Sequence, residues 1–245
     1  MPVDRATRRA VRRLAAAFTA VSVLAVLTGC LPVVTAGERL TEERDIPDAT
    51  SVVLRSSGDV TVRLGDEPSL SVTGGENVLA RLRTEVENGR LVIDVQRGPI
   101  LVGAGDLDID ITLTSLKAVA ITGSGDVTAD FDGAEEVTLE IGGSGGISAE
   151  GVDASSVRAS ISGSGEIEAD GSTDRLDVQV SGSGSVDTSR LRAIEAVVVL
   201  SGSGSIDVDV AESLDVTLSG SGSVSYSGRP QVRSTVSGSG EIGPA

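Results

Sequence analysis

The residues best suited to chemistry in this 245-residue chain are carboxylates spaced two apart in strand-like stretches. They fall into three groups: Asp106, Asp108 and Asp110; Glu166, Glu168 and Asp170; and Asp207 and Asp209. Residues two apart on a β-strand share one face, so each group would present its oxygens together. Paired carboxylates can act as acid and base on a glycosidic bond, and carboxylate oxygens are ligands that Ca²⁺ prefers.

Two features of the chain argue against a catalytic role for these groups. An acid–base pair needs two carboxylates in unequal surroundings, whereas these pairs recur along the chain at positions that would face outward. The chain also has no histidine to act as a base, and Lys117 is its one lysine. We therefore predict no enzyme, no catalytic residues and no cofactor, with an envelope glycan-active enzyme as the alternative.

Calcium is a separate hypothesis for the aspartates. The residues that would bind it are Asp106, Asp108, Asp110, Asp207 and Asp209. Calcium-binding nonapeptide repeats have a period of nine residues, however, and the repeat in this chain is about twice as long. The formal net charge of −16 also excludes nucleic acid as a partner, because phosphates would repel the protein.

The first 29 residues have the pattern of an export signal. Five arginines precede Leu14–Leu27, an uncharged apolar run that is too short to span a membrane. The tetrapeptide Leu27, Thr28, Gly29, Cys30 resembles the lipobox of bacterial lipoproteins. That resemblance implies cleavage before Cys30 and a lipid on its thiol, which anchors the protein to the outer face of the cell membrane. The general secretory and twin-arginine routes both stay open.

A repeat of 18 to 20 residues runs through the remainder of the chain. Its pattern is aliphatic, any, Gly, Ser, Gly, any, aliphatic, and it recurs seven times from Ile121–Val127 to Val236–Ile242. An earlier copy with Ala104 in place of serine lies at Leu101–Leu107, and Leu54–Val60 is a more distant relative. A fixed period of this length indicates stacked structural units rather than a flexible linker or a phosphate-binding loop.

Alternating apolar residues predict one strand before and one after each Gly-Ser-Gly corner. Because one unit cannot bury its own apolar face, we predict an all-β, right-handed parallel β-helix of stacked rungs. Phe131 and Tyr226 are expected in its core. The central serines would form a ladder along one corner: Ser124, Ser144, Ser164, Ser183, Ser203, Ser221 and Ser239.

The segment from Asp45 to Gly98 lacks the regular spacing, so we predict that it caps the first end of the solenoid. Within it, residues 77–82 favour a short helical segment, and Asn88-Gly89 predicts a hairpin turn. The predicted organisation is a signal at 1–29, a lipidated cysteine and tether at 30–44, and one domain at 45–242. In that domain, residues 45–98 are the cap and residues 99–242 the regular rungs.

The chain resembles the GIN domain family of auto-transporter adhesin heads over roughly residues 45–242. The resemblance rests on the segment that begins "RDIPDATSVVLRSSGDVTVRLGDEPSL" and on the Gly-Ser-Gly rungs. It implies an envelope β-solenoid without an established enzymatic activity or set of functional residues. We therefore predict a non-catalytic envelope lipoprotein that presents an acidic surface to an extended polymer or protein ligand. A lipid-tethered sensor is an alternative, and the sequence leaves the oligomeric state open.

Overall fold

The computed structural model describes residues 33–98, 100–102 and 107–245, which belong to one compact unit, Pro32–Ala245. The predicted signal, the lipobox residues and Cys30 lie outside the described residues, so their roles stay predictions. No helix in the described part of the chain is long and apolar enough to cross a membrane.

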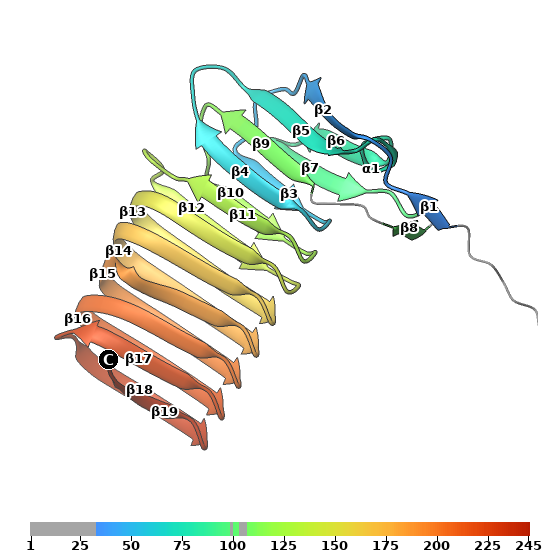
Figure 1. Cartoon of the computed structure of the whole chain (residues 1–245). Coiled ribbons are helices and arrows are strands. Elements are labelled where there is room, and N and C mark those ends of the chain that lie inside the picture. Colours follow the sequence, from blue (N-terminus) through green and yellow to red (C-terminus); the bar gives the residue numbers. More distant parts are fainter. Residues whose placement is uncertain (1–32, 99, 103–106) are drawn as a thin grey trace, which may run out of the picture. The chain divides into compact units, whose positions relative to one another are not determined.

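Most of the described chain winds into stacked turns, and each turn has a strand on either side of a sharp corner (Figure 1). Neighbouring turns pair in parallel throughout, so equivalent residues lie directly beside one another. The strands of these turns are β3 (Ser51–Leu54), β4 (Asp59–Leu64), β10 (Ala118–Ile121), β11 (Asp126–Asp130), β12 (Glu136–Ile141), β13 (Gly146–Gly163), β14 (Glu166–Gly182), β15 (Ser185–Gly202), β16 (Ser205–Gly220), β17 (Ser223–Gly228), β18 (Gln231–Gly238) and β19 (Glu241–Pro244). The fold is thus the all-β parallel solenoid that the repeat predicts.

The stacked strands form two sheets that meet at the corners. The approach sheet contains the strands that lead into each corner, namely β3, β10, β12, the second halves of β13 to β16, and β18. The return sheet contains the strands that leave it, namely β4, β11, the first halves of β13 to β16, β17 and β19. Residues therefore alternate between a shared interior and two separate outer faces.

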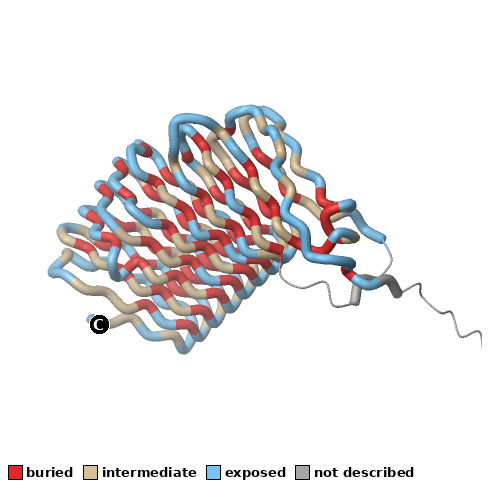
Figure 2. The backbone as a smooth tube through the Cα atoms, turned by 45° about the horizontal axis from the view of Figure 1, so that its top comes forward, coloured by how far each residue is buried: buried red, intermediate tan, exposed pale blue. Residues whose placement is uncertain are grey.

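The core lies between the two sheets, and Figure 2 shows the regular alternation of buried and exposed positions along each turn. Leu200 and Leu218 are stacked inward residues of the approach sheet, and both are almost completely buried. Burial of such a side chain stabilises the fold by about 1.5–3 kcal/mol. Phe131 is fully buried as predicted, and Tyr226 packs partly buried against the same core.

The cap covers one end of the stack with antiparallel pairs. Its elements are β1 (Val33–Thr35), β2 (Arg39–Arg44), β5 (Ser69–Gly75), α1 (Glu76–Leu79), β6 (Leu82–Glu87), β7 (Arg90–Val95), β8 (Ile100–Val102) and β9 (Asp108–Leu113). Strand β5 pairs antiparallel with β2 and β9, and β6 pairs antiparallel with β7. The predicted hairpin is confirmed, because Asn88 and Gly89 both have positive φ (53° and 75°).

The start of the regular rungs differs from the sequence prediction. We expected Leu101–Leu107 to form the rung before Ile121, but β8 pairs with β1, and residues 103–106 lie outside the described part. The stretch that stacks on β10 and β11 is instead β3 and β4, which the sequence predicts as part of the irregular cap. Leu54–Val60 is therefore a true corner, although it carries Ser56 where the later corners carry glycine.

Candidate functional site

The Gly-Ser-Gly corners stack into one continuous edge, which we call the serine edge. Its central residues are Ser124, Ser144, Ser164, Ser183, Ser203, Ser221 and Ser239, and all of them are exposed. From Ser144 onward, each of these serines donates its backbone N–H to a glycine carbonyl of the preceding turn, as Ser203 does to Gly182 at 2.9 Å. Within the described part of the chain, the hydroxyls of these serines have no protein hydrogen-bond partner. They are therefore available to a ligand.

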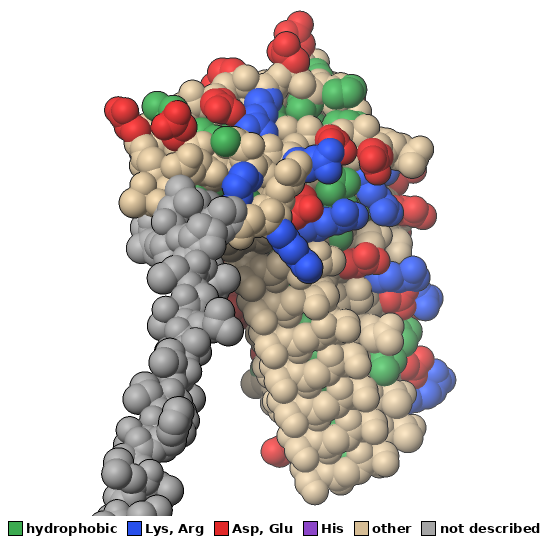
Figure 3. Space-filling view, turned by 90° about the vertical axis from the view of Figure 1, so that its right-hand side faces the viewer, with side chains coloured by type: hydrophobic (Ala, Val, Ile, Leu, Met, Phe, Trp, Pro, Cys, Tyr) green, Lys and Arg blue, Asp and Glu red, His purple; other side chains and the backbone are tan. Residues whose placement is uncertain are grey.

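The positions just before the corners add a second row of small polar side chains. These residues are Thr122, Ser162, Ser181, Ser201, Ser219 and Ser237, with Gly142 as a gap between the first two, and all seven positions are exposed. Figure 3 shows a strip free of charged side chains over the stacked turns, beside a cap that carries many charges. The serine edge and the row before it are thus an uncharged, hydroxyl-rich surface.

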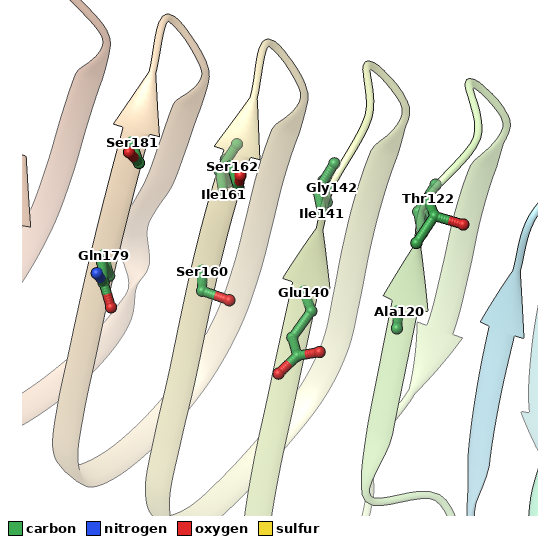
Figure 4. Close-up of a pocket in the computed structure, with 11 residues that line it drawn as sticks. Ala120, Thr122, Glu140, Ile141, Gly142, Ser160, Ile161, Ser162, Gln179 and Ser181 are labelled. Carbon is green, nitrogen blue, oxygen red and sulfur yellow. The ribbon is translucent and has the colours of Figure 1, made fainter. Parts of the chain in front are cut away.

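A hollow of about 400 Å³ lies beside this edge on the outer face of the approach sheet (Figure 4). Thr122, Ser162 and Ser181 line the side nearest the corners, and Glu140 on β12, Ser160 on β13 and Gln179 on β14 lie farther from the corners. The hollow exists because small side chains separate the longer Glu140 and Gln179. It offers hydroxyl, carboxylate and amide groups at rung spacing, about 4.8 Å.

Gly142 opens this hollow because it has no side chain, although the backbone at residue 142 leaves room for one. It stands between Thr122 and Ser162 in the row before the corners. A β-carbon at residue 142 would meet its nearest neighbours, Ile121 O and Thr122 Cγ2, at 3.8 Å, an ordinary contact distance. Sequence reasoning missed this position, although "IGGSG" at 141–145 departs from the Ser-Gly-Ser-Gly that follows the aliphatic residue at five of the seven corners.

A second hollow of about 460 Å³ continues from the first, since Ser160 and Gln179 line both. Its other lining residues include Val197 and Val199, which are half-buried on the outer face of β15. Arg158 and Arg175 also line it, and both pair with Asp177, at 3.8 and 3.3 Å. The approach sheet therefore carries a nearly neutral groove across several turns.

Carboxylates gather instead on the outer face of the return sheet. Asp108, Asp59 and Asp126 are successive neighbours in one row, and Glu168, Asp187 and Asp207 are successive neighbours in another. Among basic residues, Arg63 pairs with Asp110 at 3.2 Å and Arg190 with Glu168 at 3.2 Å. The two sheets thus differ strongly in charge.

The aspartates proposed to bind calcium are divided between distant turns. Asp108 forms an ion pair with Arg39, and Asp110 pairs with Arg63. Asp207 lies beside Asp187, and Asp209 accepts a hydrogen bond from Ser227 at 3.0 Å. Asp106 lies outside the described residues. No group of three or more His, Cys, Asp or Glu side chains in the described ranges is arranged to hold a metal ion.

Two of the carboxylates considered for acid–base work, Glu166 and Glu168, lie around a smaller hollow of about 210 Å³. Glu166, Glu168 and Asp126 line it, and Gly146 leaves it open. The backbone N–H of Gly146 donates to the Asp126 carboxylate at 2.7 Å. Asp170, the third member of the sequence group, accepts a hydrogen bond from the Gly151 N–H at 3.1 Å and does not line this hollow.

Comparison with known proteins agrees with this architecture. The chain has no match among curated proteins. Three crystal structures are similar over nearly their whole length. They are a "putative adhesin" from Bacteroides fragilis NCTC 9343 (20% identity, TM-score 0.81, 86% of this chain and 100% of that one), a "putative lipid binding protein" from Parabacteroides distasonis ATCC 8503 (25%, 0.70, 87% and 100%) and a "putative adhesin" from Parabacteroides merdae ATCC 43184 (18%, 0.65, 87% and 99%).

A family model also matches residues 49–230, which is most of the chain and includes much of the cap and all but the last of the stacked turns. The match agrees with the resemblance that the opening segment and the Gly-Ser-Gly rungs indicate. The chain therefore belongs to the family described as "Putative auto-transporter adhesin, head GIN domain".

Proposed function

We propose that this protein is an exported, lipid-anchored and non-catalytic adhesin that binds an extended, hydroxyl-rich polymer along the serine edge and the adjoining groove. The observation that carries the proposal is the serine edge itself, where exposed hydroxyls without protein partners recur on every turn. A polysaccharide presents hydroxyls that both donate and accept hydrogen bonds, as serine does. Repetition along the stack suits a long ligand better than a small molecule in a closed pocket.

The distribution of charge also supports binding of the ligand at the serine edge and the groove. The return sheet collects carboxylates, which hold it away from anionic surfaces, whereas the serine edge and the groove are nearly neutral. Without residues 1–29 the net charge would be about −20, since that segment contains five arginines and one aspartate. A neutral polymer would therefore meet the serine edge, and its retention would depend little on salt.

Retention on immobilised polymers tests this proposal. Residues 32–245 contain the whole described unit, so a soluble form can be passed over envelope polysaccharides, extracellular matrix and lipid vesicles. Vesicles are included because one structural neighbour is described as lipid binding. We expect saturable retention on a polysaccharide, reduced at least tenfold by Ser183→Lys with Ser203→Lys. The matched control, Ser148→Lys with Ser225→Lys on the return sheet, should retain binding.

Two results would contradict the proposal. Retention that the return-sheet variant abolishes and the edge variant leaves intact would place binding on the acidic face. Release of reducing sugar from the retained polymer would instead favour the glycan-active enzyme, for which the hollow lined by Asp126, Glu166 and Glu168 is the candidate site.

The lipid anchor needs its own test. Cells that produce the full chain should carry it in the membrane fraction and incorporate a labelled fatty acid into it. Cys30→Ser should abolish the label and release the protein, because no other cysteine is present. An unlabelled wild-type protein would remove the anchor from the proposal and leave the polymer-binding surface intact.

A further inference from the structure

The turn formed by β18 and β19 leaves its inward side chains uncovered. Val232 and Val236 occupy the same inward positions as Leu214 and Leu218 of the turn before. They are nevertheless 37% and 47% exposed, whereas Leu214 and Leu218 are 0% and 1% exposed. Among the described strands, β18 has a pairing register with β16 alone, so its other edge is unpaired. A strip of the hydrophobic core is therefore open at this end.

Strand β18 also lacks the features that normally protect an edge strand from pairing. Proteins blunt such edges with charges or with proline. Its eight residues contain no proline and one charged residue, Arg233, which faces outward and pairs with Asp215 at 3.7 Å. Strand β19 is protected by Pro244, which has no N–H to donate. At the other end of the unit, the edge strand β2 carries Arg39, Glu42, Glu43 and Arg44.

We propose that the open edge of β18 binds β18 of a second copy, so that two molecules join tail to tail as a two-fold symmetric dimer. The inward residues of β18 read Val232, Ser234, Val236, a pattern that is symmetric about Ser234. In an antiparallel pair centred on Ser234, Val232 of one copy lies opposite Val236 of the other. Each copy then covers the exposed valines of its partner and satisfies the backbone groups of the free edge.

The local charge favours a second copy as the occupant. Beyond Gly228 the described chain carries Arg229, Arg233 and Glu241, so this end has no excess of carboxylates in an otherwise acidic protein. Two such ends can approach while the return sheets repel one another elsewhere. Because the cap covers the opposite end of the stack, the contact closes at two copies and does not propagate into a fibre.

Combined with the proposed lipid anchor, this contact gives the protein a second mode of adhesion. Strands β1 and β2, the described elements nearest in sequence to Cys30, lie at the cap, at the opposite end from β18 (Figure 1). In a tail-to-tail dimer the two caps point away from each other. The dimer would then bridge two membranes and join one cell to another that carries the same protein.

Sedimentation of residues 32–245 over a range of concentrations tests the dimer independently of the anchor. The contact is small, so we expect a weak monomer–dimer equilibrium with a Kd on the order of 10 µM. Val236→Lys should raise that Kd at least tenfold. The matched control is Val199→Lys, a half-buried valine on the outer face of the approach sheet, which should leave the Kd unchanged. A monomer at about 100 µM, or growth beyond two copies, would overturn the proposal.

Cross-linking tests the register without depending on the stability of a lysine variant. Residues 32–245 contain no cysteine, so a single introduced thiol reports on its own neighbour. Ser234→Cys should form a disulfide-linked dimer on mild oxidation. Ser144→Cys, exposed on the serine edge, should stay monomeric under the same conditions. Equal cross-linking of the two variants would contradict pairing through β18.

Vesicle clustering separates the bridging role from the dimer itself. Residues 30–245 can be coupled through the Cys30 thiol to maleimide-lipid vesicles, and turbidity then reports contact between vesicles. We expect clustering with the wild-type protein and none with Val236→Lys. Soluble dimers without clustering would overturn membrane bridging alone. Failure of the polysaccharide retention would concern only the serine edge and the row before it, since the dimer contact uses the inward valines and the free backbone edge of β18.

Discussion

Gly143 stacks so closely on Gly123 of the preceding turn that a β-carbon at residue 143 would overlap the carbonyl oxygen of Gly123. The N–H of Ser144 donates to that same oxygen at 3.2 Å, so the turns cannot separate without losing this bond. Its sequence neighbour Gly142 has no such restriction. The two adjacent glycines therefore have different roles: Gly143 lets the turns stack closely, and Gly142 opens the groove.

This difference predicts opposite outcomes for two similar substitutions. Gly143→Ala should lower the free energy of unfolding by about 1–3 kcal/mol, because the turn must shift to admit the methyl group. Gly142→Ala should change it by less than about 0.5 kcal/mol, as an exposed substitution with room around it. Urea denaturation measures both values. Equal losses would show that the two corner positions are equally crowded.

Filling the hollow should weaken polymer binding without unfolding the protein. Gly142→Gln places a long side chain between Thr122 and Ser162, across the groove that the proposed ligand occupies. We expect retention on the polysaccharide to fall at least fivefold while the melting temperature changes little. Ser148→Gln on the return sheet is the matched control. Undiminished retention of the Gly142→Gln protein would exclude this hollow from the binding surface.

Shortening an inward side chain at the exposed end of the core should lower the free energy of unfolding only slightly. Leu200→Ala removes a fully buried inward side chain, and the resulting cavity should cost about 2–5 kcal/mol of unfolding free energy. Val236→Ala removes an inward side chain two turns farther along the same row, where 47% of it is exposed. In dilute monomer its cost should stay below about 1 kcal/mol. A large loss at residue 236 would mean that this end is already covered in solution.

Acid should weaken the fold in part through Asp187. The Ser189 hydroxyl donates to this carboxylate at 2.6 Å, and this bond holds the pKa of Asp187 below its ordinary value of 3.8. A pKa that is lowered in the fold gives stability that is complete above that ordinary value, which the unfolded chain keeps. That stability is lost as the pH falls through the folded pKa.

Asp187→Asn should therefore flatten the dependence of the melting temperature on pH below about pH 4. Ser189→Ala should do the same, because it removes the hydroxyl donor and keeps the carboxylate. An unchanged acid slope in both variants would mean that other carboxylates dominate acid unfolding. Asp48 offers a second case, since the Thr114 hydroxyl likewise lowers its pKa.

The spacing of Gly-Ser-Gly and the alternation of Val, Leu and Ile were sufficient to predict the parallel solenoid and its inward residues. Both signals are local and repeat on every turn. An ambiguous assignment in one repeat can therefore be settled by comparison with the other repeats. Within the cap, the sequence predicted the Asn88-Gly89 hairpin, because a two-residue turn with positive φ depends on adjacent residues alone. The lipid on Cys30 remains a prediction.

What the sequence by itself determined is the repeating turn, since each rung carries its own glycine corner and its own inward side chains. Only the tertiary structure decided which segments stack where the repeat is irregular. It placed Leu54 beside Ile121, and it left Leu101 beside Val34, because pairing between segments far apart in the chain depends on the cap as a whole. It also decided that Val232 and Val236 stay open, since burial at an inward position requires a neighbouring turn to cover it.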